Sequence, residues 1–327
     1  MTARPRLLVL DDREGRIEAA PAAARLRELA DVRFAPVPLA EIPADDLRDV
    51  QVLLAVRERT RLDAATLDRF PSLELILQTG GHAYHLDAQA AKERGLLVAL
   101  GRGGTAPRAA VPELTFALMI AALRQFPLAQ RSMAEGDWPA LVGRCLSGRR
   151  LGLLGVGRHG AQVARIAQAF GMEVVAWARL GATAGDEAGN GEQTIPRLGL
   201  DELLSTSDVV SVHLRLSEES RGLLDAARLR ACKPGSVLVN TARGAIVDET
   251  ALVDVLRHGP LSAAGLDVFA VEPLPADSPL RTLPNVVLTP HVGWTVEEVF
   301  AEFAAIAAGQ LADYLGGRLD PGVLLSP

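Results

Sequence analysis

Three ionisable residues in the second half of the chain each follow a predicted strand. Arg243 comes after the apolar run 236–240, Glu272 after the run 263–267, and His291 after the run 286–289. The carboxyl ends of parallel strands meet at one edge of a sheet, so we expect the three side chains to converge there. An arginine binds a carboxylate through two parallel donors, and a histidine beside a glutamate gives or takes a proton. Beside a bound hydride donor, these groups could reduce a ketone that carries a carboxylate.

Each of these residues alone also has an ordinary structural interpretation. Arg243 stands in a short polar stretch typical of a surface arginine, Glu272 precedes a proline as a solvated loop acid does, and His291 could be a hydrogen-bonded structural histidine. The conjunction of all three at equivalent strand ends favours a functional site.

The strands that must position these residues belong to a regular alternation of strands and helices. Six apolar runs in about 140 residues favour an α/β fold with a doubly wound parallel sheet. The predicted strands are 151–154, 173–177, 209–213, 236–240, 263–267 and 286–289, with helices at 200–204 and 248–258 among the connections.

Gly155, Gly157 and Gly160 form a G-x-G-x-x-G motif directly after the first of these strands. Apolar residues then recur at helical spacing over 161–170, and the next strand follows, so the context is a β-α-β unit. In such a unit the glycines permit a tight turn and a close approach of backbone to a pyrophosphate, which faces the N-terminus of the helix. The motif therefore predicts a dinucleotide site.

The first hundred residues show the same alternation. Gly80 and Gly81 come directly after a predicted strand, where glycines either contact a ligand or only form a turn. The predicted elements are strands at 6–10, 51–56, 73–77 and 96–99, and one Ala-rich helix over 17–29.

A domain boundary is expected at the glycine-rich stretch 101–105. A long helix over 111–126 follows, with Pro112 in its first turn and Pro127 ending or kinking it. A last helix over 296–315 is expected to return and pack on the first domain.

Composition limits the classes of partner. The chain of 327 residues is 49% apolar, is long enough for two domains and carries a net charge of −6 with no basic stripe, so nucleic acid is not expected. Cys145 and Cys232 have neither metal-ligand nor disulfide spacing, so no metal is expected. The longest apolar segment, 116–123, is too short to span a membrane and is expected to be a core helix, and no leader is recognised, so a cytoplasmic protein is expected.

Three blocks in order, 233–244, 265–273 and 288–291, carry a resemblance to a known family. Over nearly its whole length the chain resembles the D-isomer-specific 2-hydroxyacid dehydrogenases. The resemblance implies that Arg243 anchors the substrate carboxylate, that His291 donates or accepts the proton, and that Glu272 is its partner. It also implies that Asp267 contacts the nicotinamide amide and that Gly80 and Gly81 offer backbone N–H groups to the substrate.

The resemblance implies a domain order as well. Residues 1–101 with 296–327 would form a flavodoxin-like substrate domain, and residues 102–295 an inserted Rossmann domain, with the active site in the cleft between them. Such proteins are usually homodimers joined through the cofactor domains, and closure of the cleft excludes water. The residues expected at the cofactor are Gly155, Gly157, Arg158, His159, Gly160, Ala178, Arg179, His213, Thr241, Ala242, Asp267, His291 and Gly293.

The implied activity is NAD(P)-dependent interconversion of a 2-keto acid and a D-2-hydroxy acid, as in glyoxylate and hydroxypyruvate reductases. Many relatives carry an aspartate at the end of the second Rossmann strand, whereas this chain has Ala178 followed by Arg179. Loss of the carboxylate removes a repulsion of the 2′-phosphate, and Arg179 could pair with that phosphate, so the sequence leans to NADPH over NADH. The alternative that Arg179 is merely solvated stays open. Arg215, where many relatives have proline, is also expected near the cofactor.

Other interpretations lead to different tests. A non-enzymatic protein that senses NAD(H) through partner binding is the main alternative, while a hydrolase is disfavoured because the chain lacks G-x-S-x-G. A phosphoglycerate dehydrogenase with an appended regulatory domain is disfavoured, because the given sequence ends at Pro327, soon after the expected return helix. The side chains that either line the substrate pocket or only pack are His82, Tyr84, His85 and Trp294.

Overall fold

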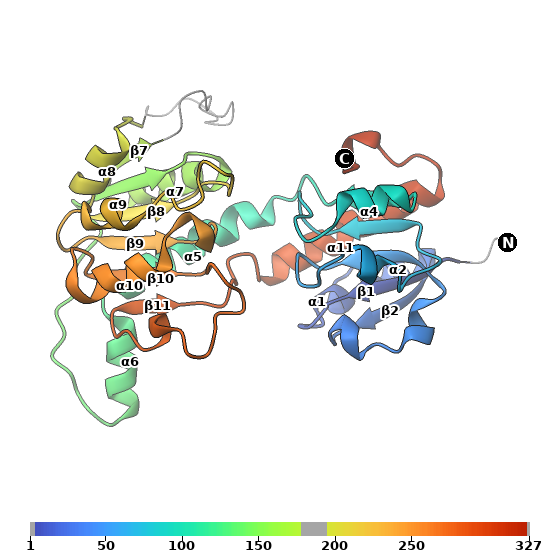
Figure 1. Cartoon of the computed structure of the whole chain (residues 1–327), viewed down its shortest axis with the longest axis horizontal. Helices are drawn as coiled ribbons and strands as arrows, with labels where there is room; N and C mark the ends of the chain where they lie inside the picture. The colour runs from blue at the N-terminus through green and yellow to red at the C-terminus, as the bar shows by residue number, and fades with distance from the viewer. Residues whose placement is uncertain (1–3, 178–194, 326–327) are drawn as a thin grey trace. The chain divides into compact units, whose positions relative to one another are not determined.

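The computed structural model describes residues 4–177 and 195–325, which form two compact units (Figure 1). Unit 1 comprises residues 1–106 and 295–327, and unit 2 comprises residues 107–294. The boundaries expected from the sequence were 101/102 and 295/296. Each unit is described by itself.

Unit 1 contains a five-stranded parallel sheet in the order β2-β1-β3-β4-β5, which is the flavodoxin-like order. Strands β1, β3 and β4 are buried almost throughout, because helices cover both faces of a parallel sheet. The strands are β1 (Arg6–Leu10), β2 (Asp31–Ala35), β3 (Val50–Ala55), β4 (Leu75–Gln78) and β5 (Leu97–Leu100), and the α-helices are α1 (Arg16–Ala19), α2 (Ala23–Leu29), α3 (Ala64–Leu67), α4 (Ala88–Glu93) and α11 (Glu297–Leu315).

Two expectations for unit 1 were wrong. The single helix expected over 17–29 is two helices, α1 and α2, because Pro21 forces Ala20 out of the helical region to ψ 144°. Strand β2 was missed because only one of its residues, Ala35, is buried, so its sequence lacks a clear apolar run.

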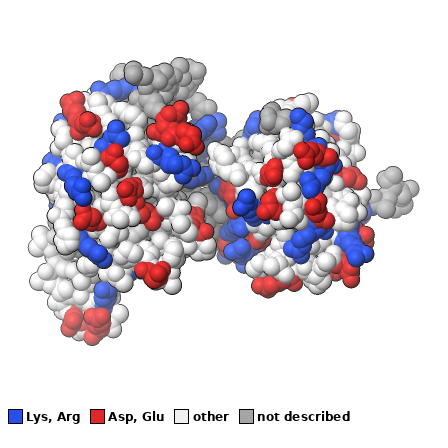
Figure 2. Space-filling model, viewed as in Figure 1, with Lys and Arg blue, Asp and Glu red and all other residues white. Residues whose placement is uncertain are grey.

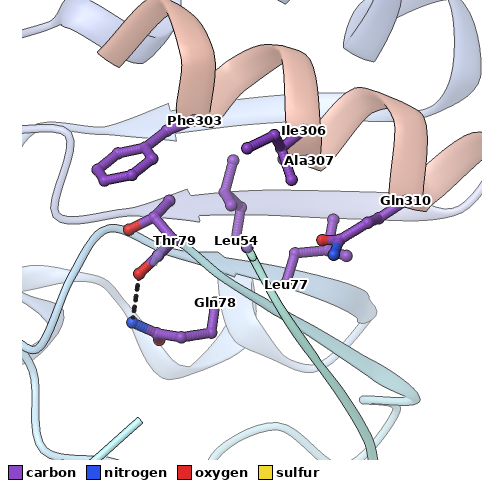
Figure 3. A pocket seen from close by; sticks show the side chains of 9 residues that line it. Leu54, Leu77, Gln78, Thr79, Phe303, Ile306, Ala307 and Gln310 are labelled. Carbon is purple, nitrogen blue, oxygen red and sulfur yellow. Dashed lines mark hydrogen bonds between the residues drawn. The ribbon is translucent and has the colours of Figure 1, made fainter. Parts of the chain in front are cut away.

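The helix α11 covers the carboxyl half of the unit 1 sheet. Figure 3 shows Phe303 and Ala307 of α11 pointing onto the ends of β3 and β4, where Leu54 and Leu77 lie. The buried side chain of Gln310 donates a hydrogen bond to the carbonyl oxygen of Leu100 (2.8 Å), so the same helix also holds β5. This confirms the return helix expected from the sequence.

Unit 2 contains a six-stranded parallel sheet in the order β11-β10-β9-β8-β6-β7. Beyond β7, a parallel bridge between Ala176 and Arg197 adds a further position at that edge. The strands are β6 (Arg150–Leu154), β7 (Glu173–Trp177), β8 (Val209–Val212), β9 (Val237–Asn240), β10 (Ala263–Leu266) and β11 (Val286–Leu288), and the helices are α5 (Ala106–Leu123), α6 (Phe126–Ala134), α7 (Arg158–Ala169), α8 (Leu200–Thr206), α9 (Ala226–Arg230) and α10 (Glu249–His258).

Side chains of this sheet alternate between two cores. Leu153 packs with α5 and α7 on one face, whereas the next residue, Leu154, packs with α8 and α10 on the other. Helices therefore cover both faces, which confirms the doubly wound α/β fold and all six strands expected in this part of the chain.

The helix α5 begins five residues earlier than expected. The carboxylate of Glu302 accepts hydrogen bonds from the backbone N–H groups of Thr105 (2.7 Å) and Ala106 (3.0 Å), so it caps the helix from a distant part of the chain. Pro112, expected in the first turn, consequently lies inside the helix. By length and composition α5 could cross a membrane, but half of it is buried inside the protein, and its segment 116–123 packs in a core as expected.

Candidate active site

The glycine motif forms a tight turn between β6 and α7. Gly155 adopts φ +96°, which favours glycine, and its N–H donates to the carbonyl oxygen of Trp177 (2.9 Å). A side chain at Gly160 would collide with the carbonyl oxygen of Gly155. Around Gly157, in contrast, a Cβ would meet no atom within 4 Å. The turn is therefore compact on its inner side and open at Gly157.

This open position lies at the N-terminus of α7. Gly157 is the N-cap residue and supplies no side chain to the first N–H groups of the helix. The N–H groups at the start of a helix and the positive end of its dipole fit a pyrophosphate, and the open space at Gly157 leaves room for it. The residues present therefore fit a dinucleotide.

Two histidines stand beside this turn. His213 follows β8 and its Nε2 lies 2.8 Å from the hydroxyl of Ser211, and burial lowers its pKa to about 3. Burial also lowers the pKa of His159, and the nearby charges of Arg158, Arg243 and Arg108 lower it further. Three arginines around a neutral histidine make this edge of the sheet suitable for an anion.

The segment after β9 presents Arg243. The side chain of Asn240 donates to the carbonyl oxygen of Arg243 (3.0 Å) and accepts from the N–H of Ala242 (3.0 Å), so it fixes the turn at both ends. Gly244 packs against the backbone of Phe269, and no larger residue fits there. The backbone of Arg243 is thereby held at the carboxyl edge of the sheet.

Asp267 follows β10 and is buried, with 1% of its surface exposed. Its carboxylate accepts hydrogen bonds from the Thr289 hydroxyl (2.6 Å) and from the N–H groups of Val292 (2.8 Å) and Gly293 (2.9 Å). Burial raises the pKa of Asp267, and these hydrogen bonds offset only part of that effect. The carboxylate thus holds the segment that follows β11 on both sides of His291.

His291 lies in this segment with φ +56°, an unusual value for a residue with a side chain. Its Nδ1 lies 2.6 Å from Oε2 of Glu272, and the other oxygen, Oε1, accepts from the N–H of Phe269 (2.9 Å). Burial alone would raise the pKa of Glu272, but hydrogen bonds from His291 and Phe269 and the charges of His291 and Arg243 lower it below its ordinary value. Glu272 is therefore an ionised partner for the imidazole.

The structure therefore brings Arg243, Glu272 and His291 together at one edge of the unit 2 sheet, as the sequence predicted. Arg243 is close enough to lower the pKa of both Glu272 and His159. Since Glu272 binds Nδ1 of His291, Nε2 is the nitrogen available for proton exchange with a ligand. Chemically, this edge can bind an anion and transfer a proton beside a dinucleotide.

Gly80 and Gly81 follow β4 in unit 1. Gly80 has φ +90°, and no residue in the described ranges accepts a hydrogen bond from the backbone N–H of either glycine. Gly101 packs closely against this turn, since a Cβ on Gly101 would lie 2.9 Å from the backbone nitrogen of Gly80. Two adjacent unpaired N–H groups in such a turn suit an anionic group.

The remaining residues that the sequence placed near the cofactor or substrate differ in exposure, and two of them lie outside the described ranges. Trp294 is buried, with 8% of its surface exposed, and Arg215 is exposed. Ala178 and Arg179 lie outside the described residues. Within residues 4–177 and 195–325, no cluster of three or more His, Cys, Asp or Glu side chains could hold a metal ion.

Sequence reasoning missed several residues that shape these sites. Thr289 orients Asp267, and its place at the end of β11 could have indicated this. Arg108 lies near His159, but nothing in the sequence places the start of α5 beside the glycine turn. Glu58 closely follows the end of β3 and bonds to His82, so the strand-end rule that located Arg243 would have found it.

Comparisons with known proteins agree with this geometry. Residues 116–293 match the family model described as "D-isomer specific 2-hydroxyacid dehydrogenase, NAD binding domain". A hydroxypyruvate reductase of Thermotoga maritima is 38% identical over 253 residues, which cover 75% of this chain and 79% of that protein.

Two further relatives cover more of the chain. A D-3-phosphoglycerate dehydrogenase of Mycobacterium tuberculosis is 38% identical over 305 residues, 91% of this chain but 55% of that protein, so the chain spans about half its length. The crystal structure of the TT0316 protein of Thermus thermophilus is 36% identical, with a TM-score of 0.82 over 98% of this chain and 100% of that one.

Proposed function

The chain belongs to the family of D-isomer-specific 2-hydroxyacid dehydrogenases, and we propose that it interconverts a 2-keto acid and a D-2-hydroxy acid by hydride transfer. One observation carries the proposal: the pair of His291 and Glu272, 2.6 Å apart, stands with Arg243 at the sheet edge that also bears the glycine turn. A protein that only senses the cofactor needs the glycine turn but not this pair.

The nicotinamide, when bound, supplies the hydride to C2 of the keto acid. His291 gives the proton from Nε2 to the carbonyl oxygen as it becomes a hydroxyl, and in the oxidative direction it takes that proton back. Glu272 stabilises the imidazolium before the transfer and keeps the ring oriented through Nδ1. Arg243 binds the substrate carboxylate with its planar guanidinium. The donation of backbone N–H groups by Gly80 and Gly81 to the same carboxylate stays a prediction.

For the cofactor, we propose NADPH over NADH. The support is the sequence itself, in which Ala178 and Arg179 occupy the place of the ribose-binding acid. Without the acid, the 2′-phosphate meets no repulsion, and Arg179 provides a partner for it.

A homodimer is the proposed assembly. The helix α6 has no buried residue, and in Figure 1 it extends away from the sheet of its own unit together with the connection that follows. In Figure 2 this part of the molecule shows an uncharged area beside a group of acidic and basic side chains at its end. Exposed apolar surface of this kind supports contact with a second copy. The exposed side chains are Phe126 (44%), Met133 (52%), Trp138 (87%) and Val142 (88%).

The test is an absorbance assay with NADH and with NADPH, each combined with glyoxylate, hydroxypyruvate, pyruvate and phenylpyruvate. Turnover of at least one keto acid is expected. Absence of turnover with every pair would remove the proposal and favour the sensing alternative. Light scattering of the same sample measures the assembly, and a monomeric mass would contradict the dimer.

A further inference from the structure

His159 is the second residue of α7, and it lies in the first turn of that helix beside the open position at Gly157. A pyrophosphate fits this turn, because helix N–H groups and the positive end of the helix dipole face the open space. The side chain of His159 is partly buried and makes no hydrogen bond to any residue that the structure describes. Its two ring nitrogens are therefore available to a ligand of the glycine turn.

Neighbouring residues show on which side of α7 the imidazole of His159 lies. His213 follows β8 and packs against the glycine turn, since a Cβ on Gly160 would lie 3.4 Å from the Cβ of His213. His159 is close enough to His213 to lower the pKa of that buried ring. The imidazole of His159 thus lies at the carboxyl edge of the unit 2 sheet, and all the charged groups that act on it belong to unit 2.

The charges that act on His159 are all positive. They belong to Arg158 in the same helix, to Arg243 after β9 and to Arg108 in α5. No carboxylate of the described residues acts on this ring, and Glu272, which acts on Arg243, is already bound to Nδ1 of the catalytic histidine. Burial and the three arginines lower the pKa of His159, so its ring is neutral in the free protein at neutral pH.

A dinucleotide would change this balance, because its pyrophosphate carries two negative charges. Cations gathered around a neutral ring attract such an anion. An anion in contact with an imidazole favours the protonated form, in which both ring nitrogens donate hydrogen bonds, whereas a neutral ring has one donor and no charge. Contact with the pyrophosphate would therefore raise the pKa of His159 from its lowered value in the free protein.

We propose that His159 binds the pyrophosphate of the cofactor as an imidazolium and takes up a proton from solvent when the cofactor binds. The same proton returns to solvent when the cofactor leaves. The affinity for the cofactor should therefore increase as the pH falls from the pKa of His159 in the complex to its lower pKa in the free protein, and stay constant outside that window. The inference rests on the dinucleotide site of the proposed function, and it needs neither a keto acid nor any residue of unit 1.

The test is isothermal titration calorimetry with ADP-ribose, which contains the pyrophosphate but neither the nicotinamide nor any group that titrates between pH 6 and pH 8. Titrations at pH 7 in two buffers of different ionisation enthalpy, neither of them phosphate, give the number of protons taken up. We expect uptake of a measurable fraction of one proton. The Kd should fall by about 10-fold between pH 8 and pH 6, since one proton changes Kd by at most about 10-fold per pH unit.

Two variants assign the proton to this ring. His159→Gln keeps a polar side chain but cannot become charged, so proton uptake should be lost and Kd should no longer depend on pH. His159→Asn serves the same purpose if the first variant does not fold. His258→Gln is the matched control, because His258 is exposed on α10 and its replacement should change neither quantity. His213 is not expected to contribute, since its pKa of about 3 keeps it neutral in this range.

The outcomes separate the two proposals. Binding of ADP-ribose without proton uptake, or uptake that persists in the His159 variants, would overturn the role of His159 and leave the proposed function intact. Absence of binding of ADP-ribose, NADH and NADPH would overturn the cofactor site and both proposals with it. Uptake that depends on His159, in a protein that turns over no keto acid, would support the inference while refuting the proposed function.

Discussion

The carboxylate of Asp267 binds the chain on both sides of His291, through the Thr289 hydroxyl before it and through the N–H groups of Val292 and Gly293 after it. The position of the His291 imidazole therefore depends on a carboxylate that binds its neighbours in the chain. The left-handed backbone at His291, φ +56°, is held by these contacts.

Asp267→Asn removes a charged acceptor from three donors. We expect a loss of about 1–3 kcal/mol in the free energy of unfolding, since an amide presents a poorly matched donor to them, and a fall in kcat through misplacement of His291. Urea denaturation and steady-state kinetics measure the two effects. Thr289→Val removes only the hydroxyl contact and should show a smaller version of both, whereas wild-type kcat in Asp267→Asn would contradict the positioning role.

His291→Ala should lower kcat by about 10²-fold or more, the usual scale for loss of a positioned acid. Glu272→Gln should lower kcat less, because the imidazole remains but its charged form loses an ionic partner. Since the folded-state pKa of Glu272 is lowered, its ionisation stabilises the protein above its unfolded-state pKa, and this stabilisation is lost as the pH falls through the lower folded value. The difference in unfolding free energy between wild type and Glu272→Gln should therefore shrink on acidification, and a constant difference would contradict the pairing.

His213 predicts a different pH dependence. Burial lowers its pKa to about 3, whereas the unfolded chain binds a proton near pH 6.5, so the folded state loses stability as the pH falls from about 6.5 toward 3. One proton corresponds to a slope of at most about 1.4 kcal/mol per pH unit. His213→Gln should flatten this dependence in urea denaturation between pH 7 and pH 4, while substitution of the exposed His258 by Gln should leave it unchanged.

Two glycines of the motif allow a matched comparison. Ala at Gly157 meets open space and an ordinary φ of −81°, so Gly157→Ala should fold with the stability of the wild type but fill the volume beside the N-terminus of α7 and weaken NADH and NADPH binding. Ala at Gly160 collides with the carbonyl oxygen of Gly155, so Gly160→Ala should lower the melting temperature. Circular dichroism and fluorescence titration separate the two effects, and equal behaviour of the variants would contradict the assigned geometry.

Arg179→Ala tests the cofactor proposal. If the guanidinium binds the 2′-phosphate, KM for NADPH should rise while KM for NADH stays constant. Equal changes in both values would remove Arg179 from cofactor selection. Steady-state kinetics with each cofactor at a saturating keto acid concentration gives the comparison.

The sequence predicted that Arg243, Glu272 and His291 lie together at one edge of the unit 2 sheet, because each follows a buried strand with a clear apolar run. It could not predict that Asp267 orients His291, since that depends on how two strand ends lie side by side. It also misplaced the start of α5, because Glu302 lies 197 residues from Thr105. In unit 1 the break between α1 and α2 could have been predicted, because a proline disfavours the helical conformation of the residue before it. The edge strand β2, in contrast, has too few apolar residues to be recognised from sequence.

The covering of β3 and β4 by α11 has a consequence for the order of synthesis (Figure 3). The ribosome completes all five strands of unit 1 by residue 100, but the helix that covers Leu54 and Leu77 starts at Glu297. The surface formed by Leu54 and Leu77 therefore lacks this helix while residues 101–296 are translated. Unit 2 is a continuous piece of chain and can fold during that time. Unit 1, whose strands are synthesised first, is thus the last unit to be completed. Until α11 is synthesised, its exposed apolar surface makes the nascent chain prone to aggregation.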